Sequence, residues 1–170
     1  MAKLAFDAGA TVAHAGEGLV ALITAGNHGQ PSTVRNAGNT WATRTVIPTA
    51  RAYPAAVAIG GKVYALGGSN GSPLAINEEF NPTGYTWATR AAMPGARSGP
   101  AVAIIGGKVY VVGGHNGAPM TANDEYDPVA NTWATRATMP TVRHSLAAAA
   151  IGGKLYAVGG VDSVALVNAN

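Results

Sequence analysis

The sequence predicts an all-β protein built as a tandem array of similar units. The stretch IGGKVYALGG at residues 59–68 returns as IGGKVYVVGG at residues 105–114 and as IGGKLYAVGG at residues 151–160, so the period is 46 residues. The chain of 170 residues contains 23 glycines and 10 prolines, which favour short strands joined by tight turns. No segment keeps the apolar period of a helix over several turns without Gly or Pro.

The composition excludes several classes of site. Only 11% of the residues are charged and 48% are hydrophobic, which argues against a disordered chain. The chain has no cysteine, which excludes disulfides, thiolate metal sites and cysteine nucleophiles. The net charge is +3, but the repeat spreads the basic residues along the chain. Because no basic run with interleaved aromatic residues occurs, we expect no nucleic-acid partner.

The N-terminal residues do not show the pattern of a signal peptide, because Asp7 interrupts the first apolar run too early. The apolar run at residues 19–23 is far too short to span a membrane. We therefore expect no membrane partner, and the sequence leaves the compartment open.

Residues 1–50 are predicted to form a degenerate first unit. Trp41 stands one period before Trp87, and each is followed by Ala-Thr-Arg, so this unit ends in register with the next. The beginning of this unit differs from the later units, because GLVALITAG at residues 18–26 stands in place of IGGKVYALGG and its later copies. An atypical terminal unit is expected, because its outer face has a different neighbour.

Residues 51–96 form the first regular unit, in which each element has its own signal. A short apolar run between turn residues indicates a buried strand, and Gly60-Gly61 then supplies a tight turn to an alternating, β-rich second strand. Asn-Pro and Met-Pro pairs close the third and fourth strands. The four predicted strands cover residues 54–59, 62–66, 75–80 and 86–90.

Residues 97–142 and 143–170 repeat this pattern. In the first of these units the predicted strands cover residues 100–105, 108–112, 121–126 and 132–136. In the last unit they cover residues 145–151, 154–158 and 164–167, with no fourth strand.

The unit resembles the kelch repeat. The resemblance is carried by a Tyr in the second strand, a Gly pair after it and a Trp in the fourth strand, supported by EYDP at residues 125–128 and by Met139-Pro140. It covers residues 41–160 strongly and residues 1–40 weakly, and it implies a β-propeller in which each repeat is one four-stranded antiparallel blade. We therefore expect a kelch-like arc of about four blades, the last lacking its outer strand. The recurring residues are Tyr64, Tyr110 and Tyr156; Gly67-Gly68, Gly113-Gly114 and Gly159-Gly160; and Trp41, Trp87 and Trp133.

The distribution of side-chain size agrees with this fold. The predicted first strands are made of small residues, as in PAAVA, PAVA and LAAAA, and strands converge around a propeller axis where space is short. The bulky Trp falls on the predicted fourth strand, at the wide perimeter. We therefore expect the alanine-rich strands inside and the tryptophans at the rim.

The number of repeats leaves the assembly open. Kelch-like propellers commonly close with six or seven blades, and propellers in general have about four to eight. The chain could be part of a longer propeller, a small four-bladed ring, or half of a two-chain propeller. Because an open arc leaves blade faces to bury, the pattern favours a homo-oligomer.

Three arginines are candidate binding residues: Arg51, Arg97 and Arg143 recur once per period, just before each predicted first strand. In a closed propeller they would lie at one mouth of the channel, where a ring of like charges could bind an anion, a sialic-acid-like sugar or an acidic peptide. In the alternative interpretation, each arginine bonds carbonyl groups between blades.

The loops after the second strands add Asn70, His115 and Asn116, and His144 follows the third arginine. The histidines lack metal-ligand spacing, so we expect no metal and no cofactor. A copper site like that of galactose oxidase, a kelch-containing enzyme, is excluded because it needs a Cys-modified Tyr. Glu79 and Glu125 recur once per unit and are expected to pair with arginines rather than to catalyse.

These observations predict a non-enzymatic kelch-like propeller that binds a protein or a glycan, or assembles with itself into a structural module. The alternative is an enzyme similar to the kelch-type sugar mutarotases. That alternative would need convergent side chains at one mouth, for which Arg97, Arg143 and His144 are the candidates.

Overall fold

The computed structural model describes residues 10–15, 19–24, 33–35 and 41–163, with side chains from residue 41 onward. Within these residues the chain is all-β, as predicted, with strands β1 to β14 and no helix. None of this part of the chain therefore forms a helix long and apolar enough to cross a membrane.

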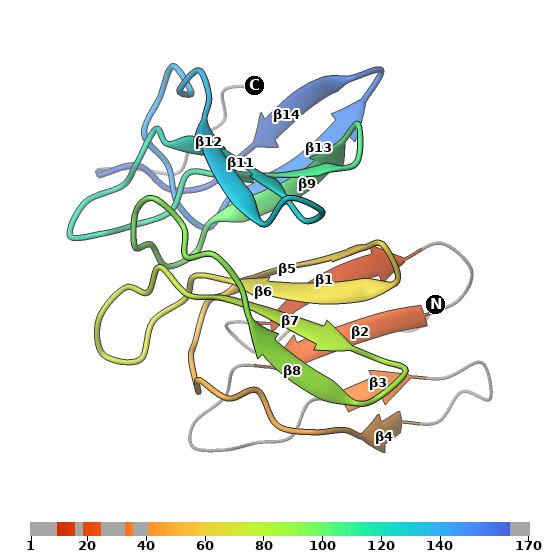
Figure 1. The fold of residues 1–170 in the computed structure, drawn as a ribbon. Helices are drawn as coiled ribbons and strands as arrows, with labels where there is room; N and C mark the ends of the chain where they lie inside the picture. Colours follow the sequence, from red (N-terminus) through yellow and green to blue (C-terminus); the bar gives the residue numbers. More distant parts are fainter. Residues whose placement is uncertain (1–9, 16–18, 25–32, 36–40, 164–170) are drawn as a thin grey trace, which may run out of the picture.

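Three four-stranded antiparallel sheets follow one another along the chain, and in each of them strands consecutive in sequence are neighbours (Figure 1). The first blade contains β1 (Ala10–Ala15), β2 (Leu19–Thr24), β3 (Thr33–Arg35) and β4 (Trp41–Thr43). The second blade contains β5 (Ala55–Ile59), β6 (Lys62–Leu66), β7 (Asn77–Asn81) and β8 (Thr86–Thr89). The third blade contains β9 (Ala101–Ile105), β10 (Lys108–Val112), β11 (Asn123–Asp127) and β12 (Thr132–Thr135).

The described part of the last blade is a hairpin of β13 (Ala147–Ile151) and β14 (Lys154–Val158). The third strand expected at residues 164–167 lies outside the described residues. The second strands of the last three blades, β6, β10 and β14, begin and end at the predicted residues.

The third strands begin two residues later than predicted, at Asn77 and Asn123. The residues before them bond outside the strand ladder, since the carbonyl of Ala75 accepts a hydrogen bond of 2.8 Å from the amide of Met93 and that of Ile76 accepts one of 2.9 Å from the amide of Gly67. Apolar composition alone does not distinguish such residues from a strand.

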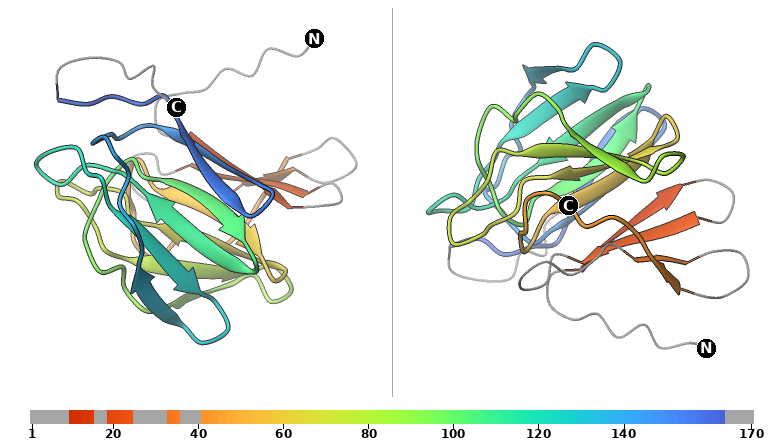
Figure 2. Two further views of the ribbon diagram at one scale, coloured as in Figure 1. Left: turned by 90° about the horizontal axis from the view of Figure 1, so that it is seen from above. Right: turned by 60° about the horizontal axis from the view of Figure 1, so that its bottom comes forward.

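The first strands of successive blades lie side by side along the inside of the arc. β1 packs against β5, β5 against β9, and β9 against β13 (Figures 1 and 2). The expectation that the alanine-rich strands lie inside is therefore confirmed. Small side chains are required there because the blades approach most closely at the axis.

The main core lies between the second and third blades. Tyr126 is fully buried there, with its ring centroid 5.7 Å from that of Tyr64 and 4.8 Å from that of Trp133. The buried residues of this core are Ala55, Val57, Tyr64, Leu66, Met93, Val109, Val111 and Tyr126. One face of the second blade thus packs directly on one face of the third.

The tryptophans lie on the fourth strands, as predicted, but they are not fully buried. Trp87 and Trp133 are half-buried, and Trp41 is 55% exposed. The indole nitrogen of Trp87 donates to the carbonyl of Thr45 (3.0 Å), and that of Trp133 donates to the carbonyl of Ala91 (2.8 Å). Trp87 and Trp133 therefore each form a hydrogen bond to the segment that leads from the preceding blade into their own blade.

Candidate functional site

All three predicted arginines are buried, each inside its own blade. Arg51 is 3% exposed, forms an ion pair with Glu78, and donates to the carbonyls of Gly67 (3.1 Å) and Ile76 (3.3 Å). Burial lowers the pKa of Arg51, and the charge of Glu78 opposes that shift. These carbonyls belong to the same blade as the arginine, so the bonds tie one blade together rather than joining two.

Arg97 forms the corresponding ion pair in the third blade. It is 1% exposed and forms an ion pair with Asp124, which also accepts a hydrogen bond from Thr135 (3.0 Å). Arg143, 3% exposed, donates to the carbonyl of Gly159 (3.2 Å) and to the hydroxyl of Thr141 (3.2 Å). Because all three side chains are buried, anion binding by this ring stays a prediction that would require the arginines to become accessible.

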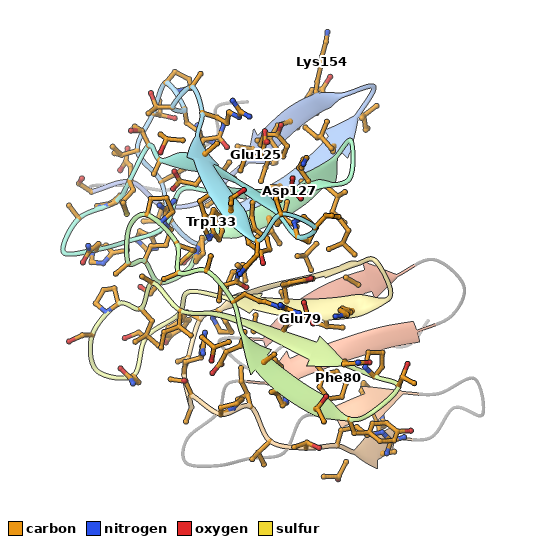
Figure 3. The ribbon with its side chains drawn as sticks, in the orientation of Figure 1. Glu79, Phe80, Glu125, Asp127, Trp133 and Lys154 are labelled. Atoms are coloured by element: carbon orange, nitrogen blue, oxygen red, sulfur yellow. The ribbon has the colours of Figure 1, made fainter. Side chains whose placement is uncertain are left out.

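The recurring glutamates of the third strands, Glu79 and Glu125, are held by arginines, as expected. Glu79 accepts two hydrogen bonds of 2.8 Å from Arg90 and one of 2.7 Å from the hydroxyl of Tyr64, and it pairs with Lys62. Burial raises the pKa of Glu79, but the hydrogen bonds from Arg90, Lys62 and Tyr64 outweigh this effect and lower it to about 2. Glu125, which is labelled in Figure 3, accepts hydrogen bonds of 2.8 Å and 2.9 Å from Arg136.

The structure brings two of the predicted histidines together between the third and last blades. The ring centroids of His115 and His144 are 5.3 Å apart in an edge-to-face arrangement. Nδ1 of His144 lies 3.0 Å from the hydroxyl oxygen of Ser145. Burial, followed by the proximity of His115, lowers the pKa of His144. The His144 ring is therefore expected to be mostly neutral at pH 7.

A line of backbone hydrogen bonds fixes this mouth of the arc. The amide of Ser145 donates to the carbonyl of Gly99 (2.8 Å), and the amide of Gly99 donates to the carbonyl of Tyr53 (2.9 Å). The three residues stand one repeat apart and share a left-handed backbone, with φ of 53° to 58°. Each blade is thus bonded to the next at the same point. We call Tyr53, Gly99, His115, His144 and Ser145 the mouth cluster.

The two predicted asparagines, Asn70 and Asn116, occupy loop turns. The amide of Asn70 donates to the carbonyl of Ser72 (3.3 Å), and the amide of Asn116 donates to that of Ala118 (3.0 Å). Both side chains are exposed. Asn70 borders an open hollow of about 510 Å³, lined also by Thr49, Arg51 and Ser69.

One face of the last blade is exposed. The register of β13 on β14 places Ala147, Ala149, Ile151, Tyr156 and Val158 on the same face, which we call the open face. Ile151 is 70% exposed, Tyr156 46% and Val158 49%. In the second blade the equivalent residues include Tyr64 and Leu66, which are 3% and 0% exposed beneath the third blade.

A family model described as the kelch motif matches residues 50–94 and 96–140, which together make up more than half of the chain. The chain belongs to the kelch family. The two matched kelch repeats coincide with β5–β8 and β9–β12, so each repeat forms one blade.

The kelch fold is also evident from a solved structure entitled "Structure of YjhT". It superimposes with a TM-score of 0.77 at 16% sequence identity and covers 90% of this chain and 58% of that one. The kelch chain therefore spans less than two thirds of that protein, and at this identity the similarity shows the fold alone. The search of curated proteins found no match.

Sequence reasoning identified His115 and His144 and expected an open arc to expose blade faces, but it named neither the residues of the open face nor the rest of the mouth cluster. A signal for the mouth cluster was available, because Tyr53, Gly99 and Ser145 are equivalent positions of the repeat. No local pattern marks the open face, since its residues match those that other kelch blades bury. Among the described residues, no group of three or more His, Asp or Glu side chains could hold a metal ion.

Proposed function

We propose that this kelch chain is a non-enzymatic structural module that assembles with a second copy of itself through the open face of its last blade. The observation that carries the proposal is the equivalence of two faces. The face of the second blade that corresponds to the open face is buried, and the third blade covers it. A surface of this composition is therefore suited to receive another blade.

The apolar area favours a stable contact. Fully burying a side chain such as Val, Ile or Phe contributes about 1.5–3 kcal/mol. Ile151, Tyr156 and Val158 are each between 46% and 70% exposed, so covering them would contribute several times the thermal energy. Exposed apolar patches of this kind mark interaction sites.

A second copy is the occupant that the repeat supports. The chain is an arc whose first blade packs on the second through β1 and β5, and whose last blade packs on the third through β13 and β9. Two arcs joined end to end at both ends would close a ring of eight blades, which lies within the size range of propellers.

The test is the mass in solution, measured by light scattering over a range of protein concentrations. We expect a mass near twice the 17.0 kDa of one chain. The double variant Ile151→Lys with Val158→Lys should have the mass of one chain. Val129→Lys is the matched control, because Val129 is 94% exposed at the β11–β12 turn and away from the open face. A wild-type chain that is monomeric at every concentration would contradict self-assembly and favour a longer propeller whose further blades cover this face.

A sugar-active enzyme is the second candidate, and the mouth cluster is the observation that favours it. A neutral imidazole that is hydrogen-bonded to Ser145 and lies beside a second imidazole can accept a proton as a general base. Polarimetry on a panel of reducing sugars tests this role. Acceleration of mutarotation that is lost in His144→Ala would favour the enzyme, whereas equal rates with and without the protein would exclude it for those sugars.

A further inference from the structure

The loops that follow the second strands of the second and third blades carry the same exposed dipeptide. Asn70-Gly71 lies between β6 and β7, and Asn116-Gly117 lies one repeat later, between β10 and β11. Both loops extend from the same side of the arc (Figure 1). All four residues are exposed to solvent. An asparagine followed by glycine can react with its own backbone, so the contacts of these residues decide whether the loops are chemically stable.

That reaction requires two groups to be free to move. The backbone nitrogen of the glycine attacks Cγ of the asparagine, and the asparagine side chain has to turn so that Cγ meets this nitrogen. Glycine favours the attack, because it has no β-carbon beside the nitrogen. A side chain or a backbone amide that forms a hydrogen bond in the folded chain has to break that bond first.

In both loops the reacting groups are without such bonds. Neither the side chains of Asn70 and Asn116 nor the backbone N–H groups of Gly71 and Gly117 form a hydrogen bond with a described residue. The two glycines have φ of 111° and 78°, and a β-carbon placed on either would meet no atom within 4 Å. The space around each glycine nitrogen is therefore open to the asparagine side chain.

The other four asparagines whose side chains the structure describes all form hydrogen bonds. Nδ2 of Asn77 and of Asn123 donates to a backbone carbonyl (3.3 Å and 3.0 Å), and Oδ1 of Asn81 accepts from a backbone amide (3.0 Å). Oδ1 of Asn131 accepts two bonds, from a backbone amide (2.9 Å) and from a tyrosine hydroxyl (2.8 Å). None of these four is followed by glycine. Sequence and structure thus set the two Asn-Gly pairs apart from them.

The last blade shows that a carboxylate is accommodated at this position of the repeat. Asp162 stands one repeat after Asn116. The residue before each of them, Val161 or His115, forms an isolated β-bridge to the start of its own blade, so the two loops begin in the same way. Conversion of the asparagine to aspartate would therefore create a residue that the repeat already carries here.

We infer that Asn70 and Asn116 are sites of spontaneous deamidation, which adds carboxylates to this mouth of the arc. The nitrogen of the following glycine bonds to Cγ, the Cγ–Nδ2 bond breaks, and ammonia leaves with the proton that the glycine nitrogen has lost. Water then opens the cyclic imide at either of its carbonyls and gives aspartate or isoaspartate. In sum, an NH₂ group is exchanged for OH, a water molecule is consumed, and no oxidant or reductant is needed.

The consequence is a change of charge at the mouth. Each event removes one unit of charge, so the two events together lower the net charge of the chain from +3 to +1. The new carboxylate at position 116 directly follows His115 of the mouth cluster. The one at position 70 borders the hollow that Arg51 also lines. The modified mouth should therefore attract anions less, and cations more, than the unmodified mouth.

The test is incubation of the full chain at neutral pH, with samples taken over time for peptide mass spectrometry and ion-exchange chromatography. Asn70 and Asn116 should gain the mass difference between NH₂ and OH about tenfold or more faster than the other four described asparagines. Acidic forms of the chain should appear at the same rate. In the double variant Asn70→Gln with Asn116→Gln the charge should stay constant, because glutamine would have to close a larger, less favoured ring. Rates at Asn70 and Asn116 no higher than at the other asparagines would overturn the inference.

A matched variant separates the effect of the fold from that of the dipeptide. Thr132→Gly places a glycine after Asn131, whose Oδ1 accepts two hydrogen bonds. In the folded variant Asn131 should react about tenfold or more slowly than Asn116, and in urea the two rates should become similar. Circular dichroism checks that the variant is folded. Equal rates in the folded variant would show that the free side chain of Asn116 is not what makes it reactive.

The inference does not depend on self-assembly, because the two loops are separate from the open face. The double variant Ile151→Lys with Val158→Lys should therefore deamidate as fast as the wild type. A wild-type dimer in which Asn70 and Asn116 stay intact would overturn the inference and leave the proposed function unaffected. A monomeric wild type that deamidates at both residues would do the reverse.

Discussion

The carbonyl oxygen of Arg143 lies so close to Gly113 that a β-carbon at position 113 would be 2.5 Å from it. The same relationship recurs one repeat earlier, where a β-carbon at Gly67 would lie 2.5 Å from the carbonyl oxygen of Arg97. The amide of Gly114 donates to the same carbonyl of Arg143 at 3.0 Å. The glycine pair of the kelch repeat therefore brings the end of one blade's second strand against the start of the next blade.

Gly113→Ala should reduce the free energy of unfolding by about 3 kcal/mol or more, because it combines a positive φ of 64° with this backbone clash. Urea denaturation followed by tryptophan fluorescence measures the loss. Gly117→Ala is the control, since its φ of 78° is also positive but nothing lies within 4 Å of the added carbon. That variant should lose only about 1 kcal/mol. Equal losses would mean that the close approach to Arg143 is not a constraint.

Trp87→Ala should destabilise the chain by about 2–3 kcal/mol, less than for a fully buried tryptophan, because the ring is half-buried. Trp87→Phe keeps a ring beside Phe80 and removes the hydrogen bond to Thr45, so it should lose only about 1 kcal/mol. Thermal and urea unfolding measure both. A loss within about 0.5 kcal/mol for the alanine variant would show that the rim contact contributes little.

Arg97→Met should cost about 3–5 kcal/mol, because it leaves the carboxylate of Asp124 buried without its cation. The double variant Arg97→Met with Asp124→Leu should recover much of that loss, since it removes both buried charges. A double-mutant cycle from urea unfolding provides the measurement. Additive losses in the double variant would show that the two side chains are not coupled.

The stability should depend on pH through Glu79, whose pKa is lowered from 4.5 to about 2 in the folded chain. A lowered pKa means that the carboxylate stabilises the fold above pH 4.5 and that this contribution is lost as the pH falls towards 2. Glu79→Gln should remove a pH-dependent contribution on the order of 2–3 kcal/mol from this range. Glu125→Gln is the comparison, and it should have a smaller effect because Arg136 is about half exposed. An unchanged acid profile in Glu79→Gln would contradict the ion-pair assignment.

Sequence reasoning succeeded where the information is local. The second strands, the tight glycine turns and the order of strands within a blade follow from alternation and turn residues, which act over a few positions. The constant step between Tyr64, Tyr110 and Tyr156 made the repeat evident. The third strands were predicted to begin two residues too early. The backbone carbonyls of residues 75–76 form hydrogen bonds outside the pairing of the strands, and amino-acid composition does not reveal this.

By itself, the sequence determined a kelch-type array of antiparallel blades with small residues inside and tryptophans at the rim. Only the tertiary structure decided what each recurring residue contacts. It directed Arg51 and Arg97 to carboxylates of their own blades, brought His115 beside His144, and left Tyr156 exposed although Tyr64 is buried. The physical reason is that equivalent residues in a repeat have the same local sequence but different neighbours, and burial and pairing depend on the neighbour.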